Sequence, residues 1–280
     1  MKDIRCILFP VDFSTRCIAA ADQVTIWAKQ FTAEIITLHV IDPRDFSSDP
    51  DRYADEFFGA RPTLEKRGQE DLKFFGNQYL KDLNVRRIVT SGDTAREISS
   101  YAQSEKADLV MLPRDHQNIG SRLIGDSITG KVLDTCSVPV WTSEHAESQA
   151  RIVPKHILCA LHIGDELSLD AANERLLETV RSVASRFGAE VTCLYIGNSN
   201  AITLPAIAGR LAGVQHEIQG IGSLEIASGN IASGIQKAAS EHQADLIMLG
   251  RSRPGKLSYG VQVSVLKIDH RAECPVLSVF

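Results

Sequence analysis

The chain has 280 residues, of which 44% are hydrophobic and 23% charged, and its formal net charge at pH 7 is −5. This composition is typical of a globular protein with enough material for two ordinary domains. The sequence has no basic run and no aromatic residues interleaved with Arg or Lys, so we expect no nucleic-acid partner. No apolar run approaches the ~20 residues that span a bilayer, and the N-terminus lacks a cleavable signal pattern. We therefore expect a cytoplasmic protein without membrane insertion.

Strand and helix periods alternate along the first half of the chain. The pattern predicts strands over residues 5–12, 33–42, 85–92, 107–113 and 138–142, and helices over 15–31, 64–83, 94–105 and 127–136. Such alternation is typical of a parallel sheet with right-handed crossovers and helices on both faces.

A polar stretch at residues 43–62 interrupts this alternation. Aromatic residues stand among acidic ones within it, at Tyr53, Phe57 and Phe58. Two interpretations remain open: a lid-like segment, or the start of a helix that packs on its neighbour.

The second half of the chain repeats the order of the first. Residues 156–163 and 189–197 read as strands and 168–188 as a helix, and residues 228–250 match 91–113 without a gap at ten of 23 positions. This repeat predicts two copies of one domain, over residues 1–147 and 151–280. The second strands align at an offset of 156 and the third strands onward at 137, so the first copy carries 19 additional residues, which we place in 43–62.

A glycine follows the third strand of each copy. Gly92 and Gly229 predict a tight turn into a helix capped by Asp93 or Asn230. The apolar spacing of that helix predicts a buried face in both copies, formed by Ala95, Ile98, Ala102, Ala232, Ile235 and Ala239.

The six cysteines are scattered without a CxxC pair. Their apolar surroundings favour buried, reduced thiols over a metal or redox site. The histidines form no HExxH motif and no paired spacing with Cys, so the sequence predicts no metal centre.

Several strings, taken in order, resemble the universal stress protein family. They are ILFPVDFS, LHVID, SGDTAREISSYAQSEKADLVML and SVPVW in the first copy, and ASGNIASGIQKAASEHQADLIMLG and ECPVLSV in the second. The resemblance implies an α/β chain of two tandem Rossmann-like domains. Each would have an open parallel five-stranded sheet with helices on both faces.

The resemblance also implies where a nucleotide would bind. Nucleotide-binding members carry an Asp after the first strand and a Gly-x2-Gly-x9-Gly-Ser/Thr segment after the fourth, whose backbone N–H groups wrap the phosphates. Asp12 matches the Asp, and Val40 matches the second-strand residue near the base. The phosphate segment departs from the pattern, with Pro113, His116, Asp126 and Ser127 at its four positions. Arg114, Gly125 and Ser127 remain candidate anion-binding residues.

The second copy departs from the same pattern at other positions. His162 stands where Asp12 does, and the phosphate positions hold Gly250, Arg253, Val263 and Ser264. Gly250, Arg251 and Ser264 are its candidate anion-binding residues. For Ser127 and Ser264 a second interpretation stays open, because a serine at a helix start serves as an N-cap without any ligand.

No GxSxG elbow and no GxxxxGK[ST] loop occurs in the chain. We therefore expect a non-enzymatic stress-response protein that binds a ligand or a protein partner through degenerate nucleotide loops. The alternative is an ATP-binding switch or slow ATPase that uses the first domain, with ATP or another adenine nucleotide and its Mg²⁺ as cofactor. A regulator of membrane transport acting from the cytoplasm is a third possibility.

The last strand of each copy is apolar, at Val138 and Val140 in the first and Val276 and Val279 in the second. An apolar edge strand favours pairing. Single-domain members of the family dimerise through this strand, so the resemblance implies an intrachain pseudo-dimer.

Overall fold

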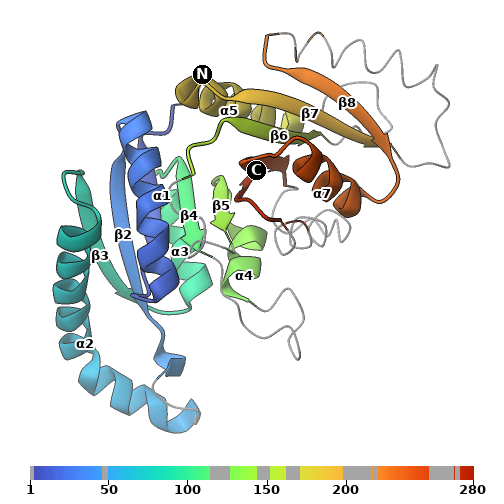
Figure 1. Cartoon of the computed structure of the whole chain (residues 1–280). Coiled ribbons are helices and arrows are strands. Elements are labelled where there is room, and N and C mark those ends of the chain that lie inside the picture. The colour runs from blue at the N-terminus through green and yellow to red at the C-terminus, as the bar shows by residue number, and fades with distance from the viewer. Residues whose placement is uncertain are drawn as a thin grey trace. The chain divides into compact units, whose positions relative to one another are not determined.

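A computed structural model describes residues 3–45, 50–113, 127–143, 152–161, 171–197, 220–251 and 272–280, together with residues 216, 218 and 268. The chain divides into two compact units, one built mainly from Ile4–Val140 and the other mainly from Ile152–Phe280 (Figure 1).

The first unit alternates strands and helices along the chain. Its elements are β1 (Cys6–Pro10), α1 (Thr15–Phe31), β2 (Glu34–Ile41), the short 3₁₀ helix η1 (Pro43–Asp45), α2 (Pro50–Tyr79), β3 (Val85–Ser91), α3 (Thr94–Ser104), β4 (Leu109–Pro113) and α4 (Ile128–Thr135). Strand β5 (Val140–Ser143) begins at the last residue of this unit, Val140. The strand order is β3-β2-β1-β4-β5. The pairs β1–β2, β2–β3 and β1–β4 are parallel. The predicted doubly wound sheet is thereby confirmed.

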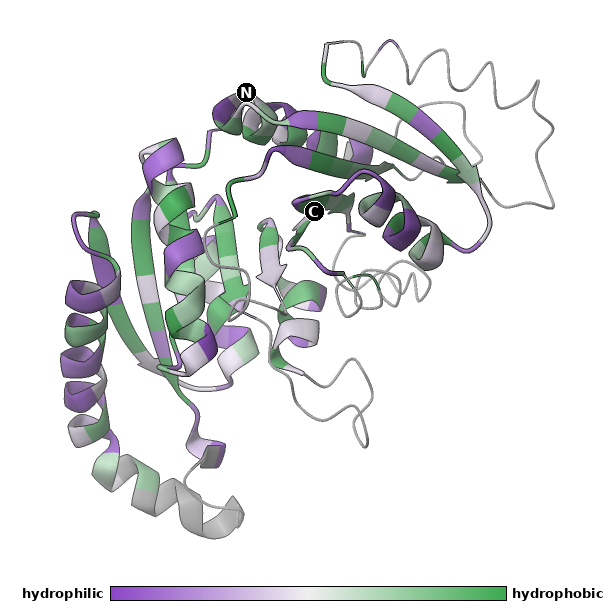
Figure 2. Cartoon of the chain, in the orientation of Figure 1, coloured by the Kyte–Doolittle hydropathy of each residue, from purple (hydrophilic) through white to green (hydrophobic). Residues whose placement is uncertain are grey.

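Two layers of helices cover this sheet. Helices α1 and α2 contact each other, and α3 contacts α4, as right-handed crossovers in opposite directions from β1 require. Ile7, Leu8 and Phe9 on β1 are fully buried because β1 lies in the middle of the sheet with helices on both sides. The strands of the unit are mostly green in the hydropathy colouring, whereas α1 and α2 carry both purple and green residues (Figure 2).

Helix α2 begins earlier than the sequence predicted. It runs over Pro50–Tyr79 instead of 64–83, so residues 50–62 of the polar stretch form the start of a helix, which was one of its two interpretations. Proline suits the first turn of a helix because its missing N–H would have no partner there, and the sequence pattern alone concealed this start. Phe57 is 4% exposed, which confirms the packed-helix interpretation for that residue. A Cβ at Gly68 would lie 3.1 Å from the His39 ring, so α2 packs closely on β2 at this glycine.

The second unit repeats the strand order of the first. Its elements are β6 (His156–Leu161), α5 (Ala171–Phe187), β7 (Glu190–Gly197), β8 (Ser223–Ser228), α7 (Ile231–Glu241), β9 (Leu246–Gly250) and β10 (Val276–Val279). Their order is β8-β7-β6-β9-β10, with parallel pairing throughout.

Backbone hydrogen bonds correct the alignment of the two copies near their ends. Val110 N–H donates to the Pro139 carbonyl at 2.9 Å, and Ile247 N–H donates to the Pro275 carbonyl at 3.0 Å. The first residues of these pairs are 137 positions apart, but the two prolines are 136 apart. The constant offset of 137 is therefore wrong for the last strand, and the second copy has one residue fewer before it.

The predicted glycine turns are confirmed in both copies. Gly92 has a φ of 154° and Gly229 a φ of 125°, values that residues with a Cβ rarely adopt. Asp93 accepts a hydrogen bond from Arg96 N–H at 3.0 Å, and Asn230 accepts one from Ser233 N–H at 3.1 Å. Ala95, Ile98, Ala102 and Ile235 are buried as expected, whereas Ala232 and Ala239 are half-buried.

All six cysteines are free thiols, and four of them are buried. Burial in the apolar interior raises the pKa of the Cys17 thiol from 9.0 to about 12, because the charged thiolate is poorly solvated there. Buried, reduced cysteines are thus confirmed at Cys17, Cys136, Cys159 and Cys193.

Candidate functional site

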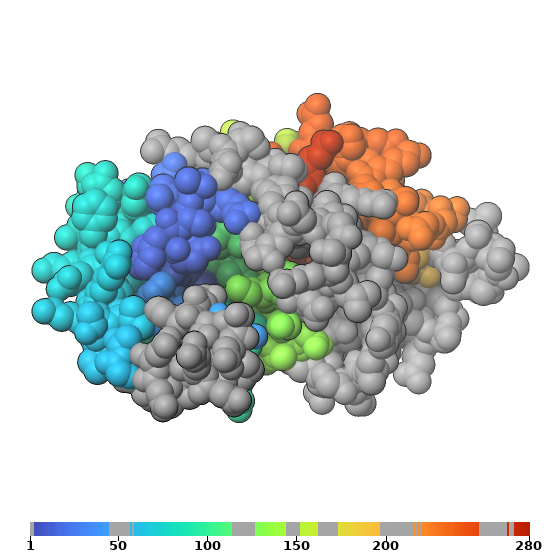
Figure 3. All heavy atoms as spheres, turned by 90° about the horizontal axis from the view of Figure 1, so that it is seen from below, coloured from blue at the N-terminus to red at the C-terminus, as the bar shows by residue number. Residues whose placement is uncertain are grey.

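The carboxyl ends of the parallel strands in the first unit meet at one edge of the sheet. Asp12 follows β1, Asp42 follows β2, Gly92 follows β3 and Pro113 ends β4. Figure 3 is a view onto this edge, on which the blue and cyan segments of the first unit lie side by side. Ligands of open α/β sheets bind at this edge, so it is the candidate site.

Asp12 organises the turn between β1 and α1. Its Oδ1 accepts hydrogen bonds from Ser14 N–H at 2.9 Å and from the Ser14 hydroxyl at 2.7 Å. Ser14 in turn caps α1, because its Oγ accepts a hydrogen bond from Cys17 N–H at 3.2 Å. Phe13, between them, has a positive φ of 61°. The carboxylate is exposed, but one of its oxygens already serves the fold.

Val40 lies at the end of β2, where its backbone is in register with Thr90 of β3, and it is half-buried. The neighbouring His39 ties β2 to the turn after β1. A carbonyl oxygen only accepts hydrogen bonds, so His39 Nδ1 carries the proton that it donates to Val11 O at 2.8 Å. The His39 ring also packs against Phe13, with 4.7 Å between ring centroids. Asp12 and Val40 therefore lie on adjacent strand ends held together by packing.

A charged network closes the β2 side of the edge. Arg44 Nε donates to Asp42 Oδ1 at 2.8 Å, and Arg44 also makes an ion pair with Asp93 at 2.9 Å. The hydrogen bonds from Arg44 lower the pKa of Asp42 below its ordinary value of 3.8, because they stabilise the carboxylate. Thr94 donates a further, longer hydrogen bond to Asp42 at 3.4 Å. This network joins the ends of β2 and β3, so Asp42 has a structural role in the loop.

Of the residues expected on the phosphate side, the structure describes Pro113 and Ser127. Pro113 ends β4 and has no N–H to donate. The Ser127 hydroxyl accepts a hydrogen bond from Gly130 N–H at 3.0 Å, which confirms its interpretation as the N-cap of α4. Arg114 and Gly125 lie outside the described residues. The described part of this side thus offers less to a phosphate than the family pattern implies.

In the second unit, fewer of the predicted site residues lie within the described part of the chain. Gly250 ends β9, and the side chain of Arg251 is buried, with a residue exposure of 5%. Arg251 N–H donates to the Val279 carbonyl at 2.6 Å, which ties this backbone to β10. His162 and Ser264 lie outside the described residues.

Sequence reasoning missed Arg44 as a member of this edge. Its signal was present, because an Arg two residues after a strand-end Asp, across a proline, is spaced to turn back onto that carboxylate. Among the described residues, no group of three His, Cys, Asp or Glu side chains is placed to hold a metal ion. In the same part of the chain, no helix is long and apolar enough to cross a membrane.

The doubly wound sheet and its polar carboxyl edge define a Rossmann-like α/β protein. The family model described as the universal stress protein family matches residues 4–143. This chain therefore belongs to the universal stress protein family.

Known proteins similar to this chain fall into two groups. A universal stress protein of Methanocaldococcus jannaschii is 27% identical over 135 residues, which cover 48% of this chain and 78% of that protein. Among solved structures, a universal stress protein of Archaeoglobus fulgidus has a TM-score of 0.72 at 20% identity, over 99% of this chain and 96% of that one. A protein of Pseudomonas aeruginosa solved as a putative universal stress protein has a TM-score of 0.66 at 16% identity, over 99% and 93%. At these identities the two structures share the fold of this chain.

Proposed function

We propose that this chain is a non-enzymatic stress-response protein of the cytoplasm, which binds a ligand or a protein partner and whose nucleotide loops have degenerated. Pro113 is the observation that carries this proposal. It stands where the family pattern has the first phosphate-binding glycine, and it removes one of the backbone donors that such a loop needs.

Two further residues support the same proposal. Ser127 and Asp12, the side chains that the family pattern assigns to the phosphate and adenine ends, both make hydrogen bonds that the fold itself uses. Their presence is therefore accounted for without a nucleotide. Pro113, Ser127 and Asp12 therefore do not fit a tightly held ATP.

The alternative function is an ATP-dependent switch or slow ATPase in the first domain. The exposed Asp12 favours it, because this carboxylate lies at the end of β1, where the family pattern has the adenine-side Asp. In that case Arg114, Gly125 and Ser127 would supply the anion contacts.

Titration of the full chain with Mg·ATP by isothermal calorimetry tests the proposal. We expect no saturable binding below a millimolar dissociation constant. The variant Pro113→Gly, which restores an N–H, should gain affinity, and Asp12→Ala should change nothing in the parent chain. Saturable micromolar binding that Asp12→Ala abolishes would contradict the proposal and establish the switch.

For assembly, we propose that the last strands of the two copies pair within one chain, through Val138, Val140, Val276 and Val279. Their apolar character supports this proposal. The chain should then sediment as a monomer. Replacing Val140 and Val276 with Lys should weaken the pairing of the last strands, and the variant should remain a monomer.

A further inference from the structure

A groove lies between α3 and α4 of the first unit, and Asp93 at one end of it also belongs to the charged network at the strand ends. It has a volume of about 510 Å³, which falls in the range of small-molecule sites. Its lining comprises Asp93, Ala95, Arg96, Ser99, Ser100, Gln103, Lys131, Thr135 and Ser137. Eight of these nine residues carry a polar side chain, so the lining offers polar partners beside its apolar surface.

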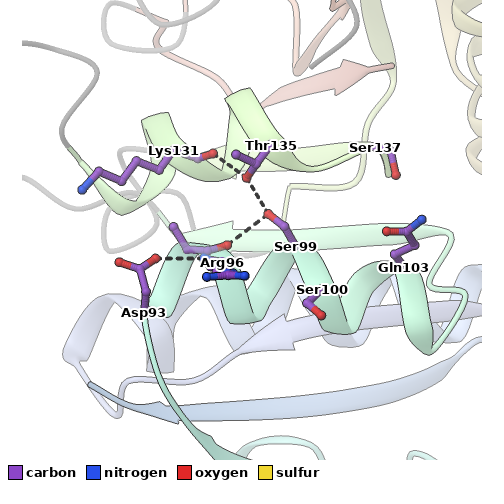
Figure 4. A pocket seen from close by; sticks show the side chains of 9 residues that line it. Asp93, Arg96, Ser99, Ser100, Gln103, Lys131, Thr135 and Ser137 are labelled. Carbon is purple, nitrogen blue, oxygen red and sulfur yellow. Dashed lines mark hydrogen bonds between the residues drawn. The ribbon is translucent and has the colours of Figure 1, made fainter. Parts of the chain in front are cut away.

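The charged side chains gather at one end of this groove. Figure 4 shows Asp93, Arg96 and Lys131 toward one end, and Gln103 and Ser137 toward the other. Both Asp93 oxygens are occupied, because Oδ1 caps α3 through Arg96 N–H and Oδ2 pairs with Arg44 at 2.9 Å. Arg44, which also pairs with Asp42, thus offsets part of the Asp93 charge from outside the groove. Arg96 and Lys131 leave this end positive, which suits an anionic group.

Two hydroxyl groups bridge the helices in the middle of the groove. Ser99 Oγ and Thr135 Oγ1 lie 2.7 Å apart, and they also reach the carbonyls of Ala95 at 3.0 Å and Lys131 at 2.8 Å. Each hydroxyl has one proton, so two protons serve three contacts. Whichever way the protons are arranged, the pair retains lone pairs that can accept a hydrogen bond. A ligand that bears hydroxyl groups would supply those donors.

The second copy shows that the fold does not require this lining. Ser233 and Gln236 of α7 stand where α3 has Arg96 and Ser99, although the two helices keep the same cap and the same buried isoleucine. The arginine and the bridging serine are therefore features of the first copy alone.

From this arrangement we propose that the α3–α4 groove of the first unit binds a sugar phosphate. The phosphate would lie between Arg96 and Lys131, and the sugar hydroxyls would contact Ser99, Thr135 and Gln103. This site is separate from the nucleotide positions, and it holds whether or not the chain binds ATP.

Titration of the full ¹⁵N-labelled chain with ribose 5-phosphate, followed by amide chemical shifts, tests the proposal. We expect saturable shifts of amides on α3 and α4. The double variant R96Q/K131Q should weaken binding at least tenfold, because it removes two charge-assisted contacts. Lys237→Gln on the exposed face of α7 is the matched control and should bind as the parent does. Ser99→Ala should weaken the binding of ribose 5-phosphate but leave the binding of inorganic phosphate unchanged.

Three results would overturn the proposal. The first is the absence of saturable shifts up to a ligand concentration on the order of 10 mM, which covers weak affinities for metabolites. The second is equal binding by the parent and R96Q/K131Q. The third is shifts confined to the strand ends around Asp12. The variant Asp12→Ala should keep the chemical-shift changes of α3 and α4 on addition of ribose 5-phosphate. The test of the groove is therefore independent of the ATP titration.

Discussion

Strands β4 and β9 occupy the same place in the two copies, but they end differently. Their first four residues, LVML and LIML, are all buried, as expected of a strand covered on both faces. The fifth residue is Pro113 in one copy and Gly250 in the other. One of these residues removes a backbone donor and the other leaves the backbone accessible. Burial therefore explains the agreement along the strands, whereas nothing in the packing constrains the residue that would meet a ligand.

Helices α3 and α7 show the same contrast on their surfaces. Both start at a capping side chain after a glycine of positive φ, and both bury an isoleucine at the same position. Their outward positions differ, with Arg96 in α3 and Ser233 in α7. The shared residues hold the helix on the sheet, and the different ones lie on its exposed surface.

The largest effect on stability should come from the isoleucine that both copies bury at the same position. Ile98 is fully buried and Ile235 is 2% exposed, so Ile98→Ala and Ile235→Ala should each cost about 2–5 kcal/mol of unfolding free energy. Urea unfolding followed by circular dichroism measures both. Similar losses of unfolding free energy would show that the two copies have equivalent cores. A loss near zero in either copy would show that their cores differ at this position.

A smaller effect on stability is expected at the residue that follows the second strand, where the two copies differ. The first copy has Asp42 there and the second has Asn198. Asp42→Asn should cost about 2 kcal/mol at pH 7, because it removes the more buried of the two carboxylates that pair with Arg44 and leaves only Asp93. Arg44 is 58% exposed, and solvent screening keeps the loss at this size.

The pH dependence gives a second measurement of the same residue. The folded pKa of Asp42 lies below 3.8, so its stabilisation is present above pH 4 and is lost as the pH falls through the lowered pKa. The difference in stability between the parent and Asp42→Asn should therefore shrink on acidification below pH 4. A difference that stays constant from pH 7 to pH 2 would contradict the role of Arg44.

The smallest effect should come from the helix caps. Asn230→Ala should cost about 1 kcal/mol, the usual value of an N-cap. Asp93→Ala should cost somewhat more, since it also breaks the ion pair with Arg44. Thermal unfolding of both variants measures the difference, and an equal loss would mean that the ion pair adds nothing.

Much of the fold could be predicted from the sequence because burial leaves a periodic pattern. The strands of both copies, the glycine turns and the caps at Asp93 and Asn230 all follow from local residue types. The start of α2 at Pro50 does not follow from the pattern alone, because aromatic residues standing among acidic ones fit a lid-like segment as well as a helix start. The one-residue shift before β10 also escaped detection, since only backbone pairing reveals the register there.

The candidate site was harder to predict than the fold. Asp12 and Ser127 were found through a family pattern, but their hydrogen bonds to Ser14 and Gly130 depend on turn geometry that the pattern does not contain. The groove between α3 and α4 left no signal in the sequence. Its residues come from two helices separated along the chain by a strand, and only folding brings Ser99 beside Thr135.

Native mass spectrometry of the freshly purified full chain tests the central claim most directly, because it reports retained nucleotide and oligomeric state together. The account predicts a mass equal to the chain alone, near 30.7 kDa, with no adenine nucleotide bound. A stoichiometric mass increase that matches ATP or another adenine nucleotide, and that disappears in Asp12→Ala, would contradict it.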